Sequence, residues 1–296
     1  MRIDASINAL VELVDDPDEL VAKHVRSKII EQGSEVLPSL TSLQDQYLDD
    51  PIKSECISKL IHHIQFEDLK RDLKNWINSD EKQLLEGVYL VCKYQYPDLT
   101  INELNDKLLE IKKGIWLEIN SKQTSFEIIK NFNTIFFDHF DFKKSESAHS
   151  SLFDIIINAV LETREGSDIA LGLIYSIVAQ SLNLPVYGVS VNGSSKTFML
   201  AFIDQNNILD LLDWGVHNNG VLFYISVSNK GLIIDPQRLK EIFKSRSVPL
   251  TKDQFEPTPN TVIVKNYLKQ LASCCENMPH FRYKLKELKE LIKLFK

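Results

Sequence analysis

The segment at residues 164–180, REGSDIALGLIYSIVAQ, combines a turn, a helix cap and a long apolar run in a way that could support chemistry. Ser167 or Asp168 can cap the helix, whose free N–H groups and positive dipole end would then stabilise a developing anion. A nucleophile is favoured at such a buried helix start. The helix begins instead with residues that carry no reactive group: Ile169, Ala170 and Leu171. The sequence therefore predicts a helix start suited to catalysis, with an apolar tip.

Residues 188–197, GVSVNGSSKT, partly match a phosphate-binding loop, because two glycines precede a Lys-Thr pair. Two extra residues separate Gly193 from Lys196, however, and the residues that follow predict a strand where the phosphate-binding mechanism needs a helix. A hairpin turn explains the segment better. We expect no nucleotide and no other cofactor.

The histidines and cysteines do not have the spacing of a metal site or a catalytic pair. His62 and His63 are adjacent on a predicted helix, so their side chains point to different faces, and no His or Cys four residues away completes a site. His139 and His149 lie beside an aromatic-rich stretch and a polar loop, and His217 lies in a turn, where a solvated role is the simplest interpretation. The four cysteines fit small core residues better than nucleophiles: Cys56, Cys92, Cys274 and Cys275. We therefore expect no metal ion.

The first 125 residues have a helical pattern throughout and predict an all-α region. Asp16 is suited to cap a helix with Pro17 in its first position, and Gly33 would end that helix. Its predicted apolar face comprises Leu20, Val21, Val25, Ile29 and Ile30. Further helices are predicted at 36–43, 52–65, 66–77, 82–96 and 99–120. We expect Trp76 and Trp116 to anchor the core, and the paired short helices resemble a HEAT-like unit.

The period of the apolar residues changes after the 168–182 helix. Four β-rich segments follow, separated by turns that contain Asn or Gly: 184–192, 197–205, 206–214 and 220–228. They predict a small antiparallel sheet packed against the 168–182 helix. A short helix capped by Asp235 comes next, and residues 260–295 predict an antiparallel helical hairpin. We interpret the basic residues of its last stretch as a solvated face, in preference to a helix that binds a membrane or a partner. This face would cover a core stripe of Leu285, Leu288, Leu291 and Phe295.

These elements predict an α+β fold in three parts. Residues 1–125 would form a helical domain, residues 126–245 an α+β core with a helix over 151–165, and residues 246–296 a C-terminal helical hairpin packed on the core. The small numbers of Gly and Pro, 10 each in 296 residues, argue against a flexible linker between the parts.

Composition argues against several classes of function. The formal net charge of -7 is unlike that of a general nucleic-acid binder, and 44% hydrophobic residues are ordinary for a globular protein. No apolar stretch has the length of a membrane span, and acidic residues occur too close to the N-terminus for a signal peptide. Scattered cysteines fit a reducing compartment. We expect a cytoplasmic protein that binds neither nucleic acid nor membrane.

Several segments resemble the bacterial SirB-type branch of the transglutaminase-like superfamily. The longest are INAVLETREGSDIALGLIYSIVAQSLNLPVYGVSVNGSSKTFMLAF and LFYISVSNKG, and shorter ones are LVDDPDELV, YQYPDL and NTVIVKNYLKQL. The resemblance covers nearly the whole chain. It implies a papain-like α+β core, in which a helix carries the nucleophile at its N-terminus and the adjacent sheet supplies a His and an acidic or amide partner.

The resemblance implies that the nucleophile position is Ala170, the histidine position is Thr197 and the third position is Ser226. The turn before the helix departs from the family pattern as well, because Asp168 stands in place of a Pro. Ala170 has no nucleophile, Thr197 cannot act as a base near neutral pH, and Ser226 has no imidazole to orient. All three positions are therefore filled by groups that cannot carry out the family's chemistry.

The three substitutions lead to the hypothesis of a catalytically inactive transglutaminase-like protein that acts as a protein-binding or scaffold module. Its helical first half would supply the interaction surface, as stacked helix pairs commonly do. The alternative is a hydrolase or acyltransferase that uses an atypical serine: Ser167, Ser194 or Ser195. No His lies between His149 and His217, so such a serine would need Lys196 for its activation.

Overall fold

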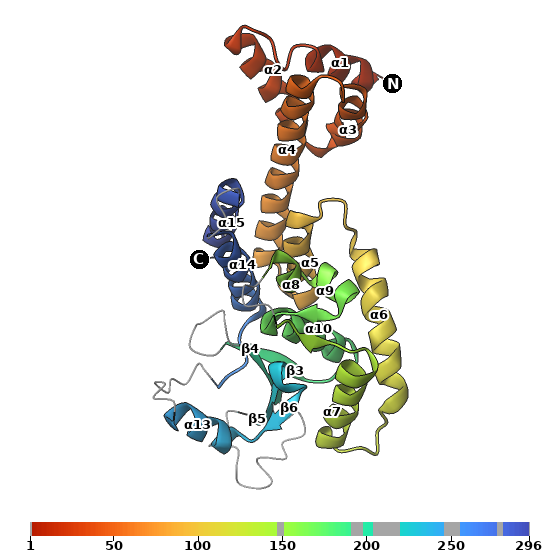
Figure 1. Ribbon diagram of the computed structural model, residues 1–296, viewed down its shortest axis with the longest axis vertical. Coiled ribbons are helices and arrows are strands. Elements are labelled where there is room, and N and C mark those ends of the chain that lie inside the picture. The colour runs from red at the N-terminus through yellow and green to blue at the C-terminus, as the bar shows by residue number, and fades with distance from the viewer. Residues whose placement is uncertain are drawn as a thin grey trace. The chain divides into compact units, whose positions relative to one another are not determined.

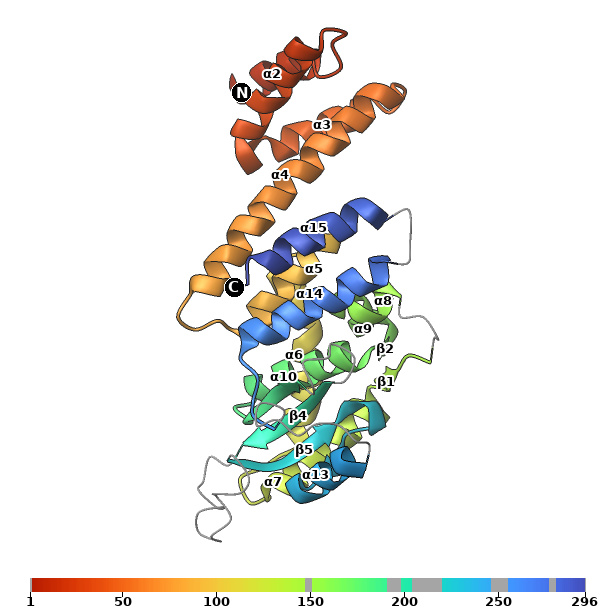
Figure 2. The same cartoon turned by 90° about the vertical axis from the view of Figure 1, so that its left-hand side faces the viewer.

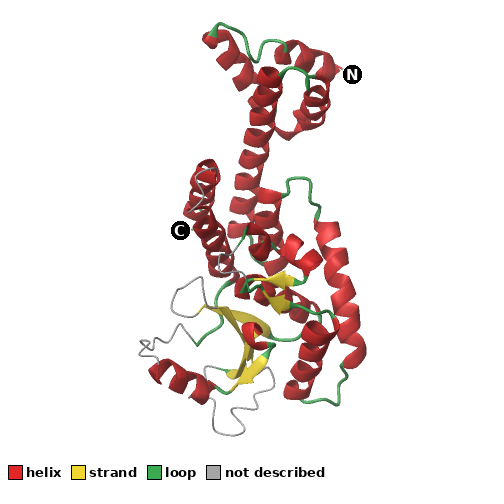
Figure 3. Cartoon of the chain, in the orientation of Figure 1, coloured by secondary structure: helices red, strands yellow, loops and turns green. Residues whose placement is uncertain are grey.

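The computed structural model describes residues 2–146, 151–190, 198–203, 220–245, 255–276 and 281–295. Figure 1 shows the helices and strands in chain order, and Figure 3 shows that helices predominate. The chain forms two compact units, Met1–Asn75 and Trp76–Lys296. The combination of many helices with small sheets confirms the predicted α+β class. The division at residues 125 and 245 remains a prediction.

The first unit is a set of helices around an apolar core. Its helices are α1 (Arg2–Val11), α2 (Glu19–Glu31), α3 (Leu37–Gln46) and most of α4 (Pro51–Asn78). All four contribute to the core, which comprises Ile7, Val11, Val14, Val25, Ile29, Val36, Leu40, Leu43, Ile57, Leu60 and Ile64. Val25 and Ile29 of the predicted apolar face of α2 are among these buried residues.

The predicted start of α2 is wrong by two residues. Asp18 caps the helix, because its Oδ1 accepts a hydrogen bond from the N–H of Leu20 at 2.9 Å. Asp16 closes the preceding turn instead, accepting from the N–H of Asp18 at 2.8 Å, so the proline precedes the helix. Leu20 and Val21, predicted to lie on the apolar face, are 79% and 37% exposed.

The two helices predicted at 52–65 and 66–77 are one continuous helix, α4. Neither Gly nor Pro occurs in this stretch after Pro51, so no residue ends the helix at the predicted break. Phe66 and Leu69 are buried and continue the apolar face across it. The predicted break between two helices is therefore wrong, because the sequence contains no residue there that would end a helix.

In the second unit, several helices pack around a central helix, α10 (Asp168–Ser181). They are α5 (Leu84–Gln95), α6 (Ile101–Glu118), α8 (Leu152–Ile155) and α9 (Ile157–Thr163). Helix α7 (Ser125–Asn133) continues into a π-helical turn at Thr134–His139. Thr100 and Thr124 form capping boxes with a Glu three residues on, which explains where α6 and α7 begin. The helix predicted over 151–165 is split at Ile156, where the backbone is extended.

The two tryptophans predicted as core anchors differ in their burial. Trp76 is buried, and its indole N–H donates to the carbonyl oxygen of Gln83 at 2.9 Å. Trp116 is 64% exposed, so its prediction is wrong. The buried residues of α6 are Leu104, Leu108, Ile111 and Ile115. Trp116 directly follows the last of them and therefore points to another face of the helix.

Helix α10 covers one face of an antiparallel sheet, as predicted. Within the described residues the strand order is β3 (Val186–Ser190), β4 (Phe198–Ile203), β5 (Val221–Ser226) and β6 (Leu232–Ile234). Gly172 of α10 lies directly against the ring of Phe198. On the opposite face, Tyr224 packs in a cluster with Phe243 of α13 (Pro236–Ser245). The strand predicted at 206–214 lies outside the described residues, and β6 was not predicted.

The C-terminal helices α14 (Asn260–Glu276) and α15 (Arg282–Lys293) lie side by side, as Figure 2 shows. Lys265, near the start of α14, donates to the carbonyl oxygen of Phe295 at 2.7 Å, so the pair is antiparallel as predicted. Leu288, Leu291 and Phe295 are buried, and Leu285 of the predicted core stripe is partly exposed. In the part of the chain that the structure describes, no helix is long and apolar enough to cross a membrane.

Candidate functional site

The start of α10 is a capped and buried helix N-terminus. Ser167 is the cap, and its Oγ accepts a hydrogen bond from the N–H of Ala170 at 3.4 Å. The N–H of Ser167 donates to the carbonyl oxygen of Asp154 at 2.7 Å. Ala170 is fully buried. The Ser167 hydroxyl therefore caps the helix, and Ala170, predicted from the resemblance to stand at the nucleophile position, contributes a methyl group.

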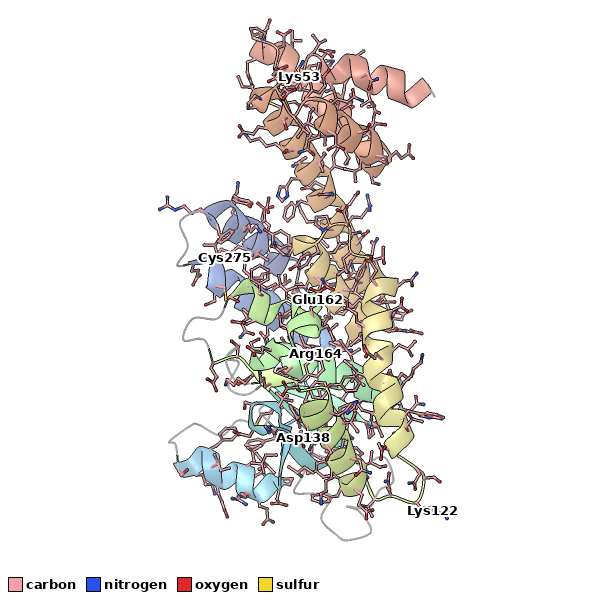
Figure 4. All side chains as sticks on the ribbon, turned by 45° about the vertical axis from the view of Figure 1, so that its right-hand side comes forward. Lys53, Lys122, Asp138, Glu162, Arg164 and Cys275 are labelled. Carbon is pink, nitrogen blue, oxygen red and sulfur yellow. The ribbon has the colours of Figure 1, made fainter. Side chains whose placement is uncertain are left out.

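The turn before α10 is held by packing and by ion pairs with Lys143 and Lys144. Arg164, marked in Figure 4, has a left-handed backbone (φ 62°), and its guanidinium carbon lies 4.8 Å from the centre of the Phe142 ring. A Cβ at Gly166 would lie 2.7 Å from a methyl group of Val160, so a glycine is required there. Lys144 Nζ lies 2.9 Å from Asp168 Oδ1. Asp168 is thus paired with Lys144 and Arg164 stacks on an aromatic ring, while Arg164 Nη1 is buried without a hydrogen-bond partner among the described residues.

Ser226 ends β5, and its hydroxyl serves the turn that follows. It is 6% exposed, and its Oγ accepts from Asn229 Nδ2 at 3.1 Å and lies 3.3 Å from Ser228 Oγ. Because side chains alternate along a strand, Ser226 shares the sheet face of Tyr224, which α13 covers. No described contact directs its hydroxyl to Ala170.

The start of α10, the start of β4 and the end of β5 nevertheless belong to one part of the fold. Gly172 of α10 contacts Phe198, the first described residue of β4. Leu200 pairs with Ile225, so the end of β5 lies beside the start of β4. The remaining candidates from the sequence lie outside the described residues: Thr197, Ser194, Ser195, Lys196, His149 and His217.

A polar network that sequence analysis missed joins α10 to the turn after β5. Tyr175 donates its hydroxyl to Asn133 Oδ1 at 2.9 Å, and Asn133 Nδ2 donates to the carbonyl oxygen of Gly231 at 2.7 Å. The N–H of Gly231 donates to the carbonyl oxygen of Ser226 at 3.0 Å. Gly231 has φ +72°, and a Cβ there would overlap with Asn133. The network positions the end of β5 relative to α10.

A family model described as the transglutaminase-like superfamily matches residues 102–269, a range that includes α10, β3, β4, β5 and part of α14. This chain belongs to the transglutaminase-like superfamily. Comparison with curated proteins and with solved structures gave no match. The match begins in α6, so it includes α6, α8 and α9, which pack on α10, as well as the sheet, whereas α5 lies before it.

A cleft in the second unit is lined by residues of other elements than α10, β4 and β5. Its volume is about 440 Å³, and it is lined by Gln95, Tyr96, Pro97, Asp98, Leu99, Glu103 and Asn158. Lys107 donates to Asn158 Oδ1 at 2.8 Å and to Glu162 Oε1 at 2.6 Å. The residues around this cleft come from α5, α6, α9 and the connecting loop. Among the described residues, no group of three or more His, Cys, Asp or Glu side chains could hold a metal ion.

The cysteines are poor candidates for a nucleophile. Cys92 is fully buried with its Sγ 4.0 Å from the hydroxyl of Tyr267, and burial raises its pKa to about 11. Burial likewise raises the pKa of Cys274 to about 11 and raises the pKa of the buried Cys275. Thiolates, not thiols, attack electrophiles, so these side chains are weak nucleophiles near neutral pH.

We expect alkylation of Cys92 and Cys274 by iodoacetamide at pH 8 to be at least about a hundredfold slower than that of an ordinary thiol, because a pKa of about 11 leaves very little thiolate at that pH. Their rates should continue to rise as pH increases beyond 9. Cys56, which is partly exposed, should react first. Peptide mass spectrometry at several pH values measures each rate, and in urea the four rates should converge. A rate for Cys92 equal to that of Cys56 at pH 8 would contradict this expectation.

Proposed function

We propose that this chain is a catalytically inactive, SirB-type member of the transglutaminase-like superfamily that acts by binding another protein. Ala170 at the buried start of α10 is the observation that carries the proposal. A helix start of this kind favours a thiolate or an alkoxide, and a methyl group cannot form either. The threonine at position 197, where the resemblance implies a histidine, supports the same conclusion, because a threonine cannot act as a base near neutral pH.

The nearest hydroxyl does not replace the missing nucleophile. Ser167 accepts a hydrogen bond as the cap of α10, and Lys144, a cation that contacts the start of the helix, is paired with Asp168. A serine becomes nucleophilic when a base accepts its proton, and the described residues place neither a His nor an unpaired Lys against this hydroxyl. The arrangement supports a structural role for Ser167.

Exposed apolar side chains in the first unit support protein binding. Leu20, Leu48 and Ile52 are 79%, 70% and 69% exposed. Apolar groups with this degree of exposure are favourable anchors for a partner surface, since docking removes them from water. The overall acidity of the chain and its unpaired cysteines fit a protein partner in a reducing, cytoplasmic setting better than nucleic acid or a membrane.

Affinity capture from native lysate tests the binding function. The intact chain should enrich a partner that an unrelated acidic protein does not, and the substitutions Leu20→Ser with Leu48→Ser should abolish that enrichment. Leu109→Ser with Leu117→Ser, two exposed apolar positions of α6, form the matched control and should retain it. Absence of any partner above the acidic control would contradict the proposal.

A serine-reactive fluorophosphonate tests the absence of catalysis. We expect no covalent adduct in the intact mass of the purified chain at neutral or alkaline pH, because its serines have no described base. An adduct at Ser167 or at residues 194–195, removed when that serine is replaced by alanine, would establish the hydrolase or acyltransferase alternative.

A further inference from the structure

One exposed face of α15 carries positive charge along its whole length. The cations on this face are Arg282, Lys286, Lys289 and Lys293, and all four are exposed. Their spacings of four, three and four residues match the helical repeat, so the four side chains lie on one side of the helix. Leu288 and Leu291, which α15 buries, lie on the opposite side. We call the four cations the basic stripe.

The basic stripe has little internal compensation. Like charges three or four residues apart on a helix are destabilising by a few tenths of a kcal/mol per pair. Lys289 lies 3.8 Å from Glu276, and the other three cations have no ion pair with any residue that the structure describes. Glu287 of the same helix accepts from the hydroxyl of Tyr94 at 2.8 Å, so it is directed toward α5 and away from the stripe. Glu290, partly exposed and four residues after Lys286, lies beside the stripe, but the five cations of α15 outnumber its two carboxylates, so the surface retains a net positive charge.

The shape of the basic stripe favours an extended anionic partner. A helix rises about 1.5 Å per residue, so the charges from Arg282 to Lys293 extend over about 16 Å, too far for one small anion. A membrane-surface helix needs an apolar face for the lipid, whereas that face of α15 is buried in the protein. Single-stranded nucleic acid needs several exposed aromatic rings, and Tyr283 is the one large apolar side chain that is exposed in the described part of α15.

We propose that the basic stripe of α15 docks an acidic helical segment of a protein partner. The argument is charge complementarity, because carboxylates at matching helical spacing would meet the four cations along one line. This inference rests on the proposed binding function and adds a second contact surface, in the second unit, together with the chemistry of the segment that it binds. Exposed ion pairs are individually weak, so the docking depends on the whole row and weakens with salt.

A fluorescein-labelled helical peptide of about 20 residues, with Glu at the matching positions, is the probe for this proposal. Fluorescence anisotropy with the intact chain should show binding that weakens as salt increases, and no binding of the same peptide with Gln in place of Glu. Lys286→Glu with Lys289→Glu should weaken binding at least about tenfold, since two attractions become repulsions. Both positions are exposed, so the fold should be retained, which a thermal melt verifies.

The matched control reverses two exposed lysines elsewhere in the same unit, Lys113→Glu with Lys122→Glu, and gives the same change in net charge. Retained peptide binding in this control supports the stripe as the docking surface. Equal weakening in both variants would overturn the inference in favour of general charge attraction. Tighter, stripe-dependent binding to anionic lipid vesicles or to single-stranded DNA than to the peptide would also overturn it.

The capture experiment separates this inference from the proposed function. If the Lys286→Glu, Lys289→Glu chain enriches the same partner as the native chain to the same extent, the binding function stands and the stripe inference fails. If the native chain enriches no partner but binds the acidic peptide through the stripe, the stripe stands as a surface and the proposed function fails.

Discussion

Replacement of Tyr267 by phenylalanine is expected to lower the free energy of unfolding by about 2–4 kcal/mol. Tyr267 is fully buried on α14, and its hydroxyl donates to the carbonyl oxygen of Ile155 at 3.0 Å and accepts from the N–H of Ile157 at 3.1 Å. These backbone groups flank Ile156, where α8 ends and α9 begins. Phenylalanine preserves the ring and leaves both buried groups without this partner.

Urea denaturation followed by circular dichroism measures the effect of Tyr267→Phe. Tyr187→Phe is the matched control, because Tyr187 is partly exposed and its hydroxyl has no hydrogen bond to a described residue. The control should change stability by less than about 0.5 kcal/mol. A Tyr267→Phe protein as stable as the control would show that the hydroxyl does not hold the break between α8 and α9.

Replacement of Gly172 by alanine is expected to lower the free energy of unfolding by about 2 kcal/mol, even though alanine favours helix over glycine. A Cβ at Gly172 would lie 2.5 Å from Phe198 Cε1, and one at Gly188 would lie 2.6 Å from Phe198 Cζ. The ring thus lies between two glycines, one on α10 and one on β3. This packing allows α10 to approach the sheet beside the candidate site.

A double-mutant cycle tests the cause of the Gly172→Ala effect. In a Phe198→Leu background, Gly172→Ala should lower the free energy of unfolding by at least about 1 kcal/mol less, because the smaller leucine side chain leaves space for the new methyl group. Additive effects of the two substitutions would contradict the proposed contact. Chemical denaturation of the four proteins supplies the required free energies.

Local signals in the sequence predicted many elements of the fold correctly. The capped start of α10 and the β-rich segments around it indicated the helix and the antiparallel sheet, because caps and residue periods act over a few neighbouring residues. The same local signals gave a wrong helix start where two residues could each act as the cap. Asp16 and Asp18 both suit a cap, and the structure uses the first in a turn and the second for the helix.

Contacts between distant residues account for what the sequence did not predict at the candidate site. Ala170 could be placed from the sequence because it follows a local cap. The network of Tyr175, Asn133 and Gly231 could not, since it joins residues 42 and 98 positions apart. The split at Ile156 also depends on a remote side chain, the hydroxyl of Tyr267. Tertiary contacts decide these features, and one sequence contains no pattern for them.

The measurement that tests the central claim most directly is the pH dependence of alkylation of a thiol introduced by Ala170→Cys. Peptide mass spectrometry separates this thiol from the native cysteines. A helix start can lower the pKa of a thiol, but strong activation in this family's arrangement also needs a neighbouring base. If the site lacks that base, the alkylation rate should rise only as pH approaches or exceeds the ordinary thiol pKa of about 8.5. A rate already at its plateau below pH 7 would show an activated site and contradict the assignment of an inactive protein.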